Sequence, residues 1–204
     1  MVSWLRSESP ANAPPSPDPD GSDAELVAQA RQGDPRAFAL LYRRYLDQVY
    51  DYCRHRLPSQ EAAEDATQTI FVKALGSIGT CRDGDRFAGW LFAIARNVIT
   101  DAYRSGRVAS VTIDDRPDIV DPARSTEDVA IAADWTRQLE RLREDCLKRD
   151  DRDLLDLRLQ GLTDREIAVA LHRSHGAIRV AQHRMVKRLR DCLGLNREAG
   201  HAVL

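Results

Sequence analysis

The residues best suited to contact a nucleic acid lie near the C-terminus, on one side of a predicted helix. At about 100° of turn per residue, six residues share this side: Arg179, Val180, His183, Arg184, Lys187 and Arg190. Arginine can donate two parallel hydrogen bonds to guanine, valine can contact a thymine methyl group, and lysine can neutralise phosphate. Between positions 163 and 190 the chain carries seven Lys/Arg and two Asp/Glu, an excess of five positive charges in a chain whose net charge is −2. The pattern favours a DNA-binding surface, with a solvated amphipathic helix as the alternative.

Two short helices and a tight turn would position these side chains. Thr163 and Glu166 have capping-box spacing, which predicts a helix start, and Ser174 can cap a second helix after the turn at 172–175. Apolar residues recur at helical spacing on either side of the turn: Ile167, Ala168, Leu171, Ile178, Ala181, Met185 and Leu189. We therefore predict a helix-turn-helix domain over residues 129–195.

A second candidate surface lies on a helix predicted over residues 60–75. Glu61, Asp65, Gln68 and Val72 share its outward side. Acidic residues also favour the N-terminal half of any helix because of the helix dipole. A docking surface for a basic partner and a simple dipole effect therefore both remain open.

A glycine-rich loop, residues 76–86, precedes a strong helix and lacks the lysine-after-glycine pattern of a phosphate-binding loop. The predicted core side of the helix comprises Phe87, Trp90, Leu91, Ile94, Val98 and Ala102. The other side carries Phe92, Arg96, Thr100 and Tyr103, with Asn97 and Arg104 at its edge. Aromatic rings interleaved with arginine can stack on unpaired bases, although packing against a neighbouring helix is the ordinary alternative.

The helical spacing of apolar residues predicts an all-α protein, and the length suits one domain or two small ones. We predict two small helical domains joined by a flexible acidic linker. The chain has 204 residues, of which 43% are hydrophobic and 30% charged, enough for a real core. We expect a domain over 22–105, a linker over 106–128, and tails over 1–21 and 196–204. From position 114 to 128 the linker has six acidic residues and two arginines, so it could lie along a basic protein channel or simply aid solubility. The N-terminus lacks the apolar core of a secretion signal, which predicts a cytoplasmic protein.

No metal, cofactor or disulfide framework is expected. The four cysteines are far apart and form no Cys-x-x-Cys pair: Cys53, Cys81, Cys146 and Cys192. Cys53 and Cys146 are predicted to be small buried residues. His172, His175 and His183 fall in the predicted turn or on the predicted DNA side, which does not favour a metal site.

Three segments together resemble the bacterial RNA polymerase sigma factors of the extracytoplasmic-function group: AEDATQTIF (63–71), FAGWLFAIARNVITDAYR (87–104) and GLTDREIAVALHRSHGAIRVAQHRMVKRLR (161–190). The resemblance covers about residues 23–193. Thr69, Val180 and Ala181 depart from residues common in that family, which leaves one polymerase contact and the base preference open.

The resemblance implies a protein that catalyses no reaction and gives core RNA polymerase its promoter specificity. Asp65 and Gln68, with Glu61 on the same side, would bind the clamp helices of the largest polymerase subunit. The loop 79–86 would capture a flipped base, and residues of the loop and the next helix would contact melted promoter DNA: Arg82, Asp83, Asp85, Arg96, Asn97, Asp101 and Arg104. The helix-turn-helix would read the more distant promoter element through Arg179, Val180, His183, Arg184 and Lys187. An anti-sigma partner, often membrane-anchored, is a further implication.

Two rival interpretations follow from the residues alone. A free-standing helix-turn-helix regulator would bind duplex DNA as a dimer, with the N-terminal domain for a ligand or partner. A hydrolase could use Asp83 and Asp85 near His55, although no motif places these groups together.

Overall fold

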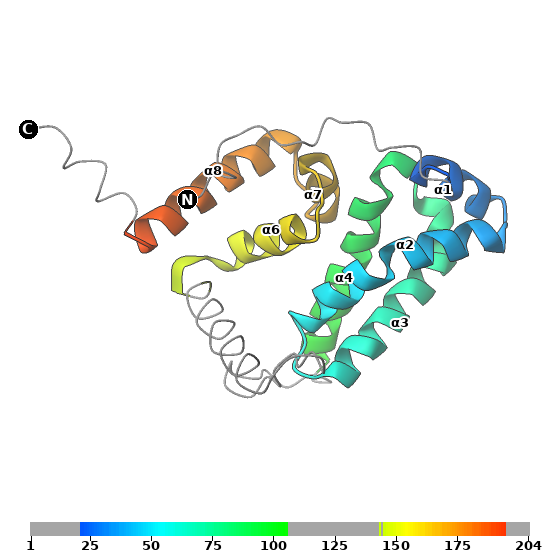
Figure 1. The fold of residues 1–204 in the computed structure, drawn as a ribbon, viewed down its shortest axis with the longest axis horizontal. Helices are drawn as coiled ribbons and strands as arrows, with labels where there is room; N and C mark the ends of the chain where they lie inside the picture. Colours follow the sequence, from blue (N-terminus) through cyan, green and yellow to red (C-terminus); the bar gives the residue numbers. More distant parts are fainter. Residues whose placement is uncertain (1–20, 106–142, 144, 195–204) are drawn as a thin grey trace, which may run out of the picture.

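The computed structural model describes residues 21–105, 143 and 145–194, and within these residues the fold is helical without a β-strand (Figure 1). Its elements in chain order are α1 (Asp23–Arg31), α2 (Pro35–Arg54), α3 (Gln60–Ser77), the 3-10 helices η2 (Ile78–Thr80) and η3 (Gly84–Arg86), α4 (Phe87–Arg104), α6 (Arg149–Leu159), α7 (Asp164–Ala170) and α8 (His175–Cys192). The predicted linker, the predicted helix after position 129 and most of both predicted tails lie outside the described residues.

The predicted helix starts are confirmed in atomic detail. Ser22 and Thr163 each accept a hydrogen bond from the backbone three residues on, and the glutamate there bonds back to complete a capping box. Asp34 caps α2 with Pro35 at its first position, and Ser174 caps α8. Short-range hydrogen bonding thus sets where these helices begin, as the spacing of the residues predicts.

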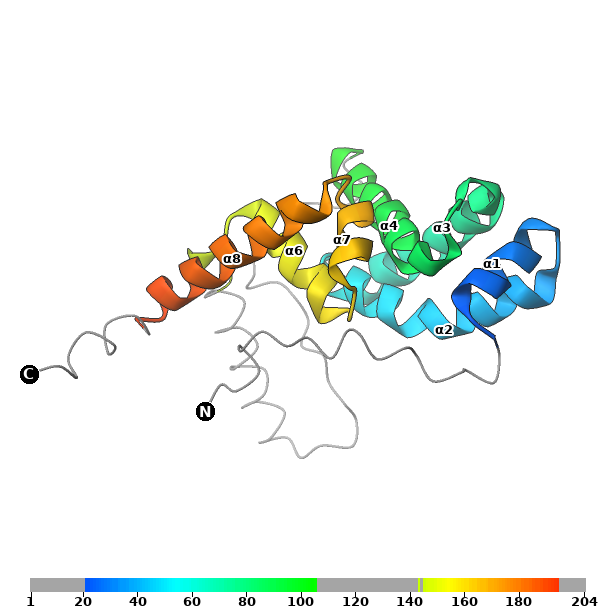
Figure 2. The same cartoon turned by 90° about the horizontal axis from the view of Figure 1, so that it is seen from above.

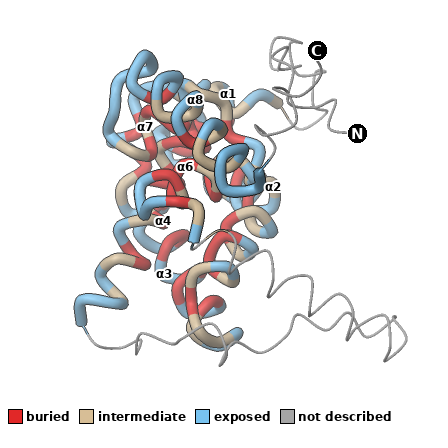
Figure 3. Tube along the Cα trace, turned by 90° about the vertical axis from the view of Figure 1, so that its left-hand side faces the viewer, coloured by how far each residue is buried: buried red, intermediate tan, exposed pale blue. Residues whose placement is uncertain are grey.

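Helices α1 to α4 enclose a large apolar core (Figure 3). Long helices α2, α3 and α4 each contribute several buried side chains, and aromatic rings lie at their crossings. Tyr52 of α2 meets Phe92 of α4 edge-on at 5.2 Å between ring centroids, and Tyr45 lies 5.3 Å from Phe87. Interlocking rings of this kind fix the angles between the helices.

Helices α6, α7 and α8 form a second, smaller group, and α7 packs directly along α4 (Figure 2). Gly89 of α4 lies against Glu166 of α7 so closely that an added Cβ would overlap the Glu166 carbonyl oxygen and lie 2.9 Å from its Cα. Because glycine has no Cβ, the two helix backbones can approach each other here.

This packing corrects one prediction about α4. Phe92 lies on the side for which both base stacking and helix packing were considered; it is fully buried, as are Leu91 and Ala95, which agrees with helix packing. Trp90 and Ile94, expected in the core, are only partly buried. Helix α4 is covered by α2 and α3 on one side and by α7 on another. A prediction based on one apolar side of the helix therefore misses the residues buried against the second partner.

The cysteine prediction is also partly wrong. Cys53 is fully buried, as predicted. Cys146, however, is half-buried and forms a disulfide bond with the exposed Cys192, with 5.7 Å between their Cα atoms. Since 46 residues separate the two in sequence, spacing alone could not reveal that the fold brings them together.

Candidate polymerase and nucleic-acid interfaces

The outward side of α3 is exposed along the whole predicted surface. Glu61, Asp65 and Gln68 are all exposed. Val72 is 71% exposed and Leu75 is 55% exposed. Helix α3 buries its other side through Ala63, Ala66, Thr67, Ile70, Phe71 and Ala74. The helix therefore presents two carboxylates, an amide and two apolar side chains to solvent.

The loop before α4 is folded against α1 rather than extended. A Cβ at Gly84 would lie 2.5 Å from the Ala24 Cα, so the close contact needs glycine. Cys81 is buried within the loop, and burial raises the pKa of its thiol to about 11. Asp83 pairs with Arg86 at 2.9 Å. Three side chains of the predicted base-capturing set are exposed on this loop: Arg82, Asp83 and Asp85.

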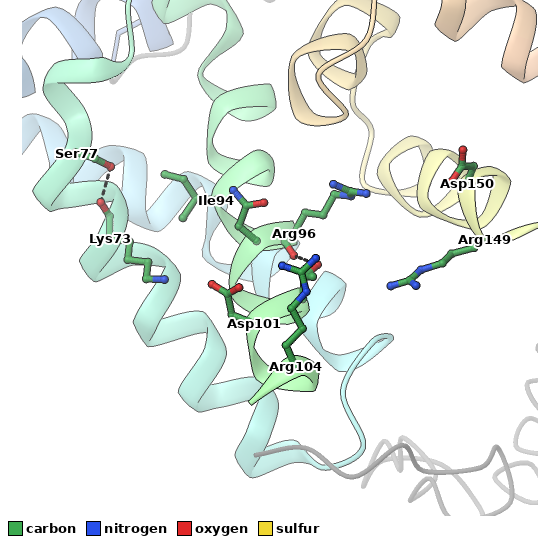
Figure 4. A pocket seen from close by; sticks show the side chains of 10 residues that line it. Lys73, Ser77, Ile94, Arg96, Asp101, Arg104, Arg149 and Asp150 are labelled. Carbon is green, nitrogen blue, oxygen red and sulfur yellow. Dashed lines mark hydrogen bonds between the residues drawn. The ribbon is translucent and has the colours of Figure 1, made fainter. Parts of the chain in front are cut away.

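A groove of about 830 Å³ lies between the C-terminal halves of α3 and α4 and the start of α6 (Figure 4). Ten residues line it: Lys73, Ser77, Ile94, Arg96, Asn97, Thr100, Asp101, Arg104, Arg149 and Asp150. The lining holds four Lys/Arg and two Asp, an excess of two positive charges. Such a groove attracts a phosphate backbone. It contains all four residues of α4 that were predicted to contact DNA.

Arg96 of this set is held by an ion pair with α6. Its Nε lies 3.2 Å from Asp153 Oδ2. Arg56, just after α2, pairs with Asp153 at 2.7 Å and with Asp156 at 2.6 Å, and its side chain is only 16% exposed. Burial raises the pKa of Asp153, but Arg56 and Arg96 outweigh burial and hold that pKa below its ordinary value of 3.8. Carboxylates of α6 thus neutralise cations at the edge of the groove.

Sequence reasoning missed this network of ion pairs. Asp151, Asp153 and Asp156 are buried, and no role was predicted for them. The available signal was their position beside Leu154 and Leu157, which predicts burial of that part of α6 and hence a need for basic partners. Which arginines pair with these aspartates depends on the tertiary fold.

The predicted reading side of α8 faces solvent. Its exposed residues are Arg179, Val180, His183, Arg184 and Lys187. Ile178 and Met185 are buried on the other side of the helix, as the apolar stripe predicts. The preceding turn contains His172 in the left-handed region at φ 52°, and Arg173 N–H donates to the Ala168 carbonyl oxygen at 2.9 Å. This tight turn joins the two helices α7 and α8.

The groups of the hydrolase alternative do not come together. His55 is followed by Arg56, whose carbonyl oxygen accepts a hydrogen bond from Tyr103 at the C-terminal end of α4. Asp83 and Asp85 instead precede the N-terminal end of α4. An 18-residue helix spans about 27 Å at 1.5 Å per residue. Within the described residues no cluster of three or more His, Cys, Asp or Glu could hold a metal ion.

None of the helices that the structure describes is long and apolar enough to cross a membrane.

Comparisons with known proteins place the chain in a family. The Sigma-70 region 2 family matches residues 41–108, which cover α3, the loop and α4. The chain is 35% identical over 175 residues to the ECF RNA polymerase sigma factor BldN of Streptomyces coelicolor, covering 81% of this chain and 63% of that protein. It is 32% identical over 173 residues to the ECF RNA polymerase sigma factor SigD of Mycobacterium tuberculosis, covering 81% of each chain.

A solved structure is similar in fold. CnrH, in complex with the cytosolic domain of CnrY, superimposes with a TM-score of 0.59 at 26% identity, over 85% of this chain and 97% of that chain. The chain therefore belongs to the extracytoplasmic-function sigma factors of the sigma-70 family. Its function is that of an alternative sigma factor, which directs promoter recognition and transcription initiation.

Proposed function

We propose that three separate surfaces divide the work of promoter recognition. The outward side of α3 binds core RNA polymerase through Glu61, Asp65 and Gln68. The loop before α4 and the groove along α4 hold the melted promoter strand. The exposed side of α8 reads the upstream promoter element in duplex DNA. The observation that carries this proposal is the separation of charge: exposed carboxylates lie on α3, and exposed cations line the groove and α8.

In the groove, bound DNA would replace the ion pair that α6 now makes. The Nε–H of Arg96 now donates to Asp153. A phosphate of the melted strand would replace the Asp153 carboxylate as the partner of Arg96. Unstacking a base costs a few kcal/mol, and stacking on an aromatic or arginine face returns about 1–3 kcal/mol per base. Since Phe92 is buried, this stabilisation would come from arginines of the loop and the groove or from Tyr103, which is 39% exposed. Binding of the melted strand therefore requires the ion pair between Arg96 and Asp153 to open.

The partners we propose are core RNA polymerase, promoter DNA and an anti-sigma protein. The last rests on the similarity to CnrH, whose solved structure contains the cytosolic domain of CnrY. An anti-sigma protein would act by covering one of the three surfaces above.

The α3 surface is tested by co-elution of the purified protein with bacterial core RNA polymerase. Asp65→Arg and Gln68→Ala should abolish or weaken co-elution, because they remove a carboxylate and an amide from the contact. Asp47→Arg is the matched control, since Asp47 is an exposed aspartate of α2 outside the proposed surface. Equal co-elution of all four proteins would remove α3 from the interface. Absence of co-elution together with tight duplex binding would favour the free-standing regulator.

A further inference from the structure

Two cysteines that are remote in sequence meet at the base of the helix-turn-helix. The disulfide bond joins Cys146, shortly before α6, to Cys192, the last residue of α8. Cys192 is exposed and Cys146 is half-buried, so small oxidants and reductants can reach the bond. The other two cysteines, Cys53 and Cys81, are buried and unpaired.

The bond ties down the C-terminal end of α8, where most residues are exposed or only partly buried. The last buried residue of α8 is Met185, and beyond it Leu189 is only partly buried. Arg188 in this stretch also forms an ion pair with Asp151 of α6. Lys187 lies in the same exposed stretch and belongs to the proposed DNA-reading side. The mobility of this helix end therefore affects how well Lys187 is positioned for DNA.

A persistent disulfide is unusual where a sigma factor works. Bacterial RNA polymerase acts in the cytosol, where thiol buffers keep most cysteines reduced and the disulfides that do form are mainly transient or redox-sensing. Exposed disulfides are also the ones most easily reduced by external thiols. Both arguments favour a reversible bond over a permanent cross-link.

We propose that Cys146 and Cys192 form a thiol–disulfide site that responds to peroxide and strengthens DNA binding by α8 when oxidised. The direction follows from pre-organisation, because a helix end already held in place loses less conformational entropy on binding. The effect on DNA rests on the function proposed above for α8, whereas the redox chemistry does not depend on it.

The chemistry balances with hydrogen peroxide as the oxidant. The thiolate of Cys192 attacks one peroxide oxygen, the O–O bond breaks, and hydroxide leaves and takes up a proton as water, which gives a sulfenic acid. The thiolate of Cys146 then attacks the Cys192 sulfur and displaces a second hydroxide, which also leaves as water. Two thiols and one peroxide thus yield one disulfide and two waters. A dithiol reverses the step by thiol–disulfide exchange.

Cys53 provides an internal comparison. It is fully buried, and burial raises the pKa of its thiol to about 11, so little reactive thiolate forms near neutral pH. Peroxide should therefore oxidise the Cys146 and Cys192 pair before it affects Cys53.

The first test measures the redox chemistry of the full-length protein. The protein is reduced with dithiothreitol, exposed to hydrogen peroxide, alkylated and analysed by peptide mass. We expect alkylation to be lost at Cys146 and Cys192, to be kept at Cys53 and Cys81, and to return at the first pair with dithiothreitol. Failure of peroxide to form the bond, or failure of dithiothreitol to reduce it in the folded protein, would overturn a reversible site.

The second test compares reduced and oxidised wild-type protein. Amide hydrogen exchange after Met185 should be about tenfold faster in the reduced form, because the helix end opens more often. Binding of the polymerase complex to a promoter duplex selected from random DNA should be about 3–10-fold tighter with the oxidised form. Cys192→Ser should remove both responses, and Cys53→Ser should keep them. Equal exchange and equal DNA binding in both redox forms would refute the switch.

Failure of the sigma function remains distinguishable from failure of this site. A protein that does not co-elute with core polymerase but shows the redox-dependent exchange would refute the polymerase interface and retain the thiol–disulfide chemistry.

Discussion

The two groups of helices are stabilised by different kinds of interaction. Helices α1 to α4 contain every aromatic pair found among the described residues, and their core includes Tyr52, Phe87 and Phe92 at less than 2% exposure. Residues 143–194 contain no Phe, Tyr or Trp at all. Their helices bury leucine, isoleucine and alanine instead, and rely on ion pairs and a disulfide.

Helix α6 shows how ion pairs stabilise the C-terminal group. Each of its four aspartates pairs with an arginine: Asp150 with Arg173, Asp151 with Arg188, Asp153 with Arg56 and Arg96, and Asp156 with Arg56 and Arg143. Two of these arginines, Arg56 and Arg96, belong to the N-terminal group. The first group is therefore held by aromatic packing, while the second is attached by the close packing of α7 on α4 and by ion pairs of α6 that a charged ligand can exchange.

The largest effect should come from breaking the aromatic core. Phe92→Ala removes a fully buried ring and its edge-on contact with Tyr52, and should lower the free energy of unfolding by about 3–5 kcal/mol. Urea denaturation followed by circular dichroism would measure it. Val72→Ala, at a site 71% exposed, is the control and should cost less than about 0.5 kcal/mol. Similar losses for both variants would contradict the view that this core dominates stability.

Arg56→Ala should separate the two groups. It leaves the buried carboxylates of Asp153 and Asp156 without their shared partner, and such a loss costs about 3–5 kcal/mol. Because Asp153 keeps Arg96 and Asp156 keeps Arg143, we expect the lower end of that range. Small-angle X-ray scattering should show a larger radius of gyration. Arg43→Ala, on the exposed side of α2, should leave the scattering unchanged; a compact Arg56→Ala protein would mean that apolar packing alone attaches α7 to α4.

Acid should weaken the contact between α6 and the N-terminal group by protonating Asp153. The pKa of Asp153 in the folded protein lies below the ordinary value of 3.8. Its ion pairs therefore stabilise the packing of α6 against the N-terminal group above that pH. This contribution is lost as the pH falls through the lower folded-state pKa. The distance between labels on α3 and α8, measured by fluorescence energy transfer, should therefore rise in acid. Asp153→Asn should already be more open at pH 7 and should respond less to acid, and identical pH curves would exclude Asp153 as the titrating group.

The smallest effect concerns a helix start within the C-terminal group. Thr163→Ala removes the side-chain oxygen that caps α7 and should cost about 1 kcal/mol of stability. Ser59→Ala makes the matched change at the start of α3, where Ser59 accepts from Ala62 N–H. Thermal unfolding would compare them. If the C-terminal group is the more weakly held, Thr163→Ala should promote its separate melting, whereas Ser59→Ala should not.

Much of the candidate surface could be predicted because it depends on position along a helix. Glu61, Asp65 and Gln68 are exposed as the 100° rotation between successive residues requires, and the same rule places Arg179 and Arg184 on the exposed side of α8. The groove could not be predicted in the same way. Its walls come from α3, α4 and α6, which are distant in sequence, and its charge balance depends on which arginine meets which aspartate.

The sequence by itself determined the helices, their caps and their exposed sides, because these depend on hydrogen bonds and periodicities within a few residues. The similarity of its motifs to known sigma factors also indicated the family. Only the tertiary structure decided that Gly89 admits α7 against α4, that Phe92 is buried, and that Cys146 meets Cys192. Each of these depends on the approach of segments far apart in the chain, and no local rule of spacing fixes that approach.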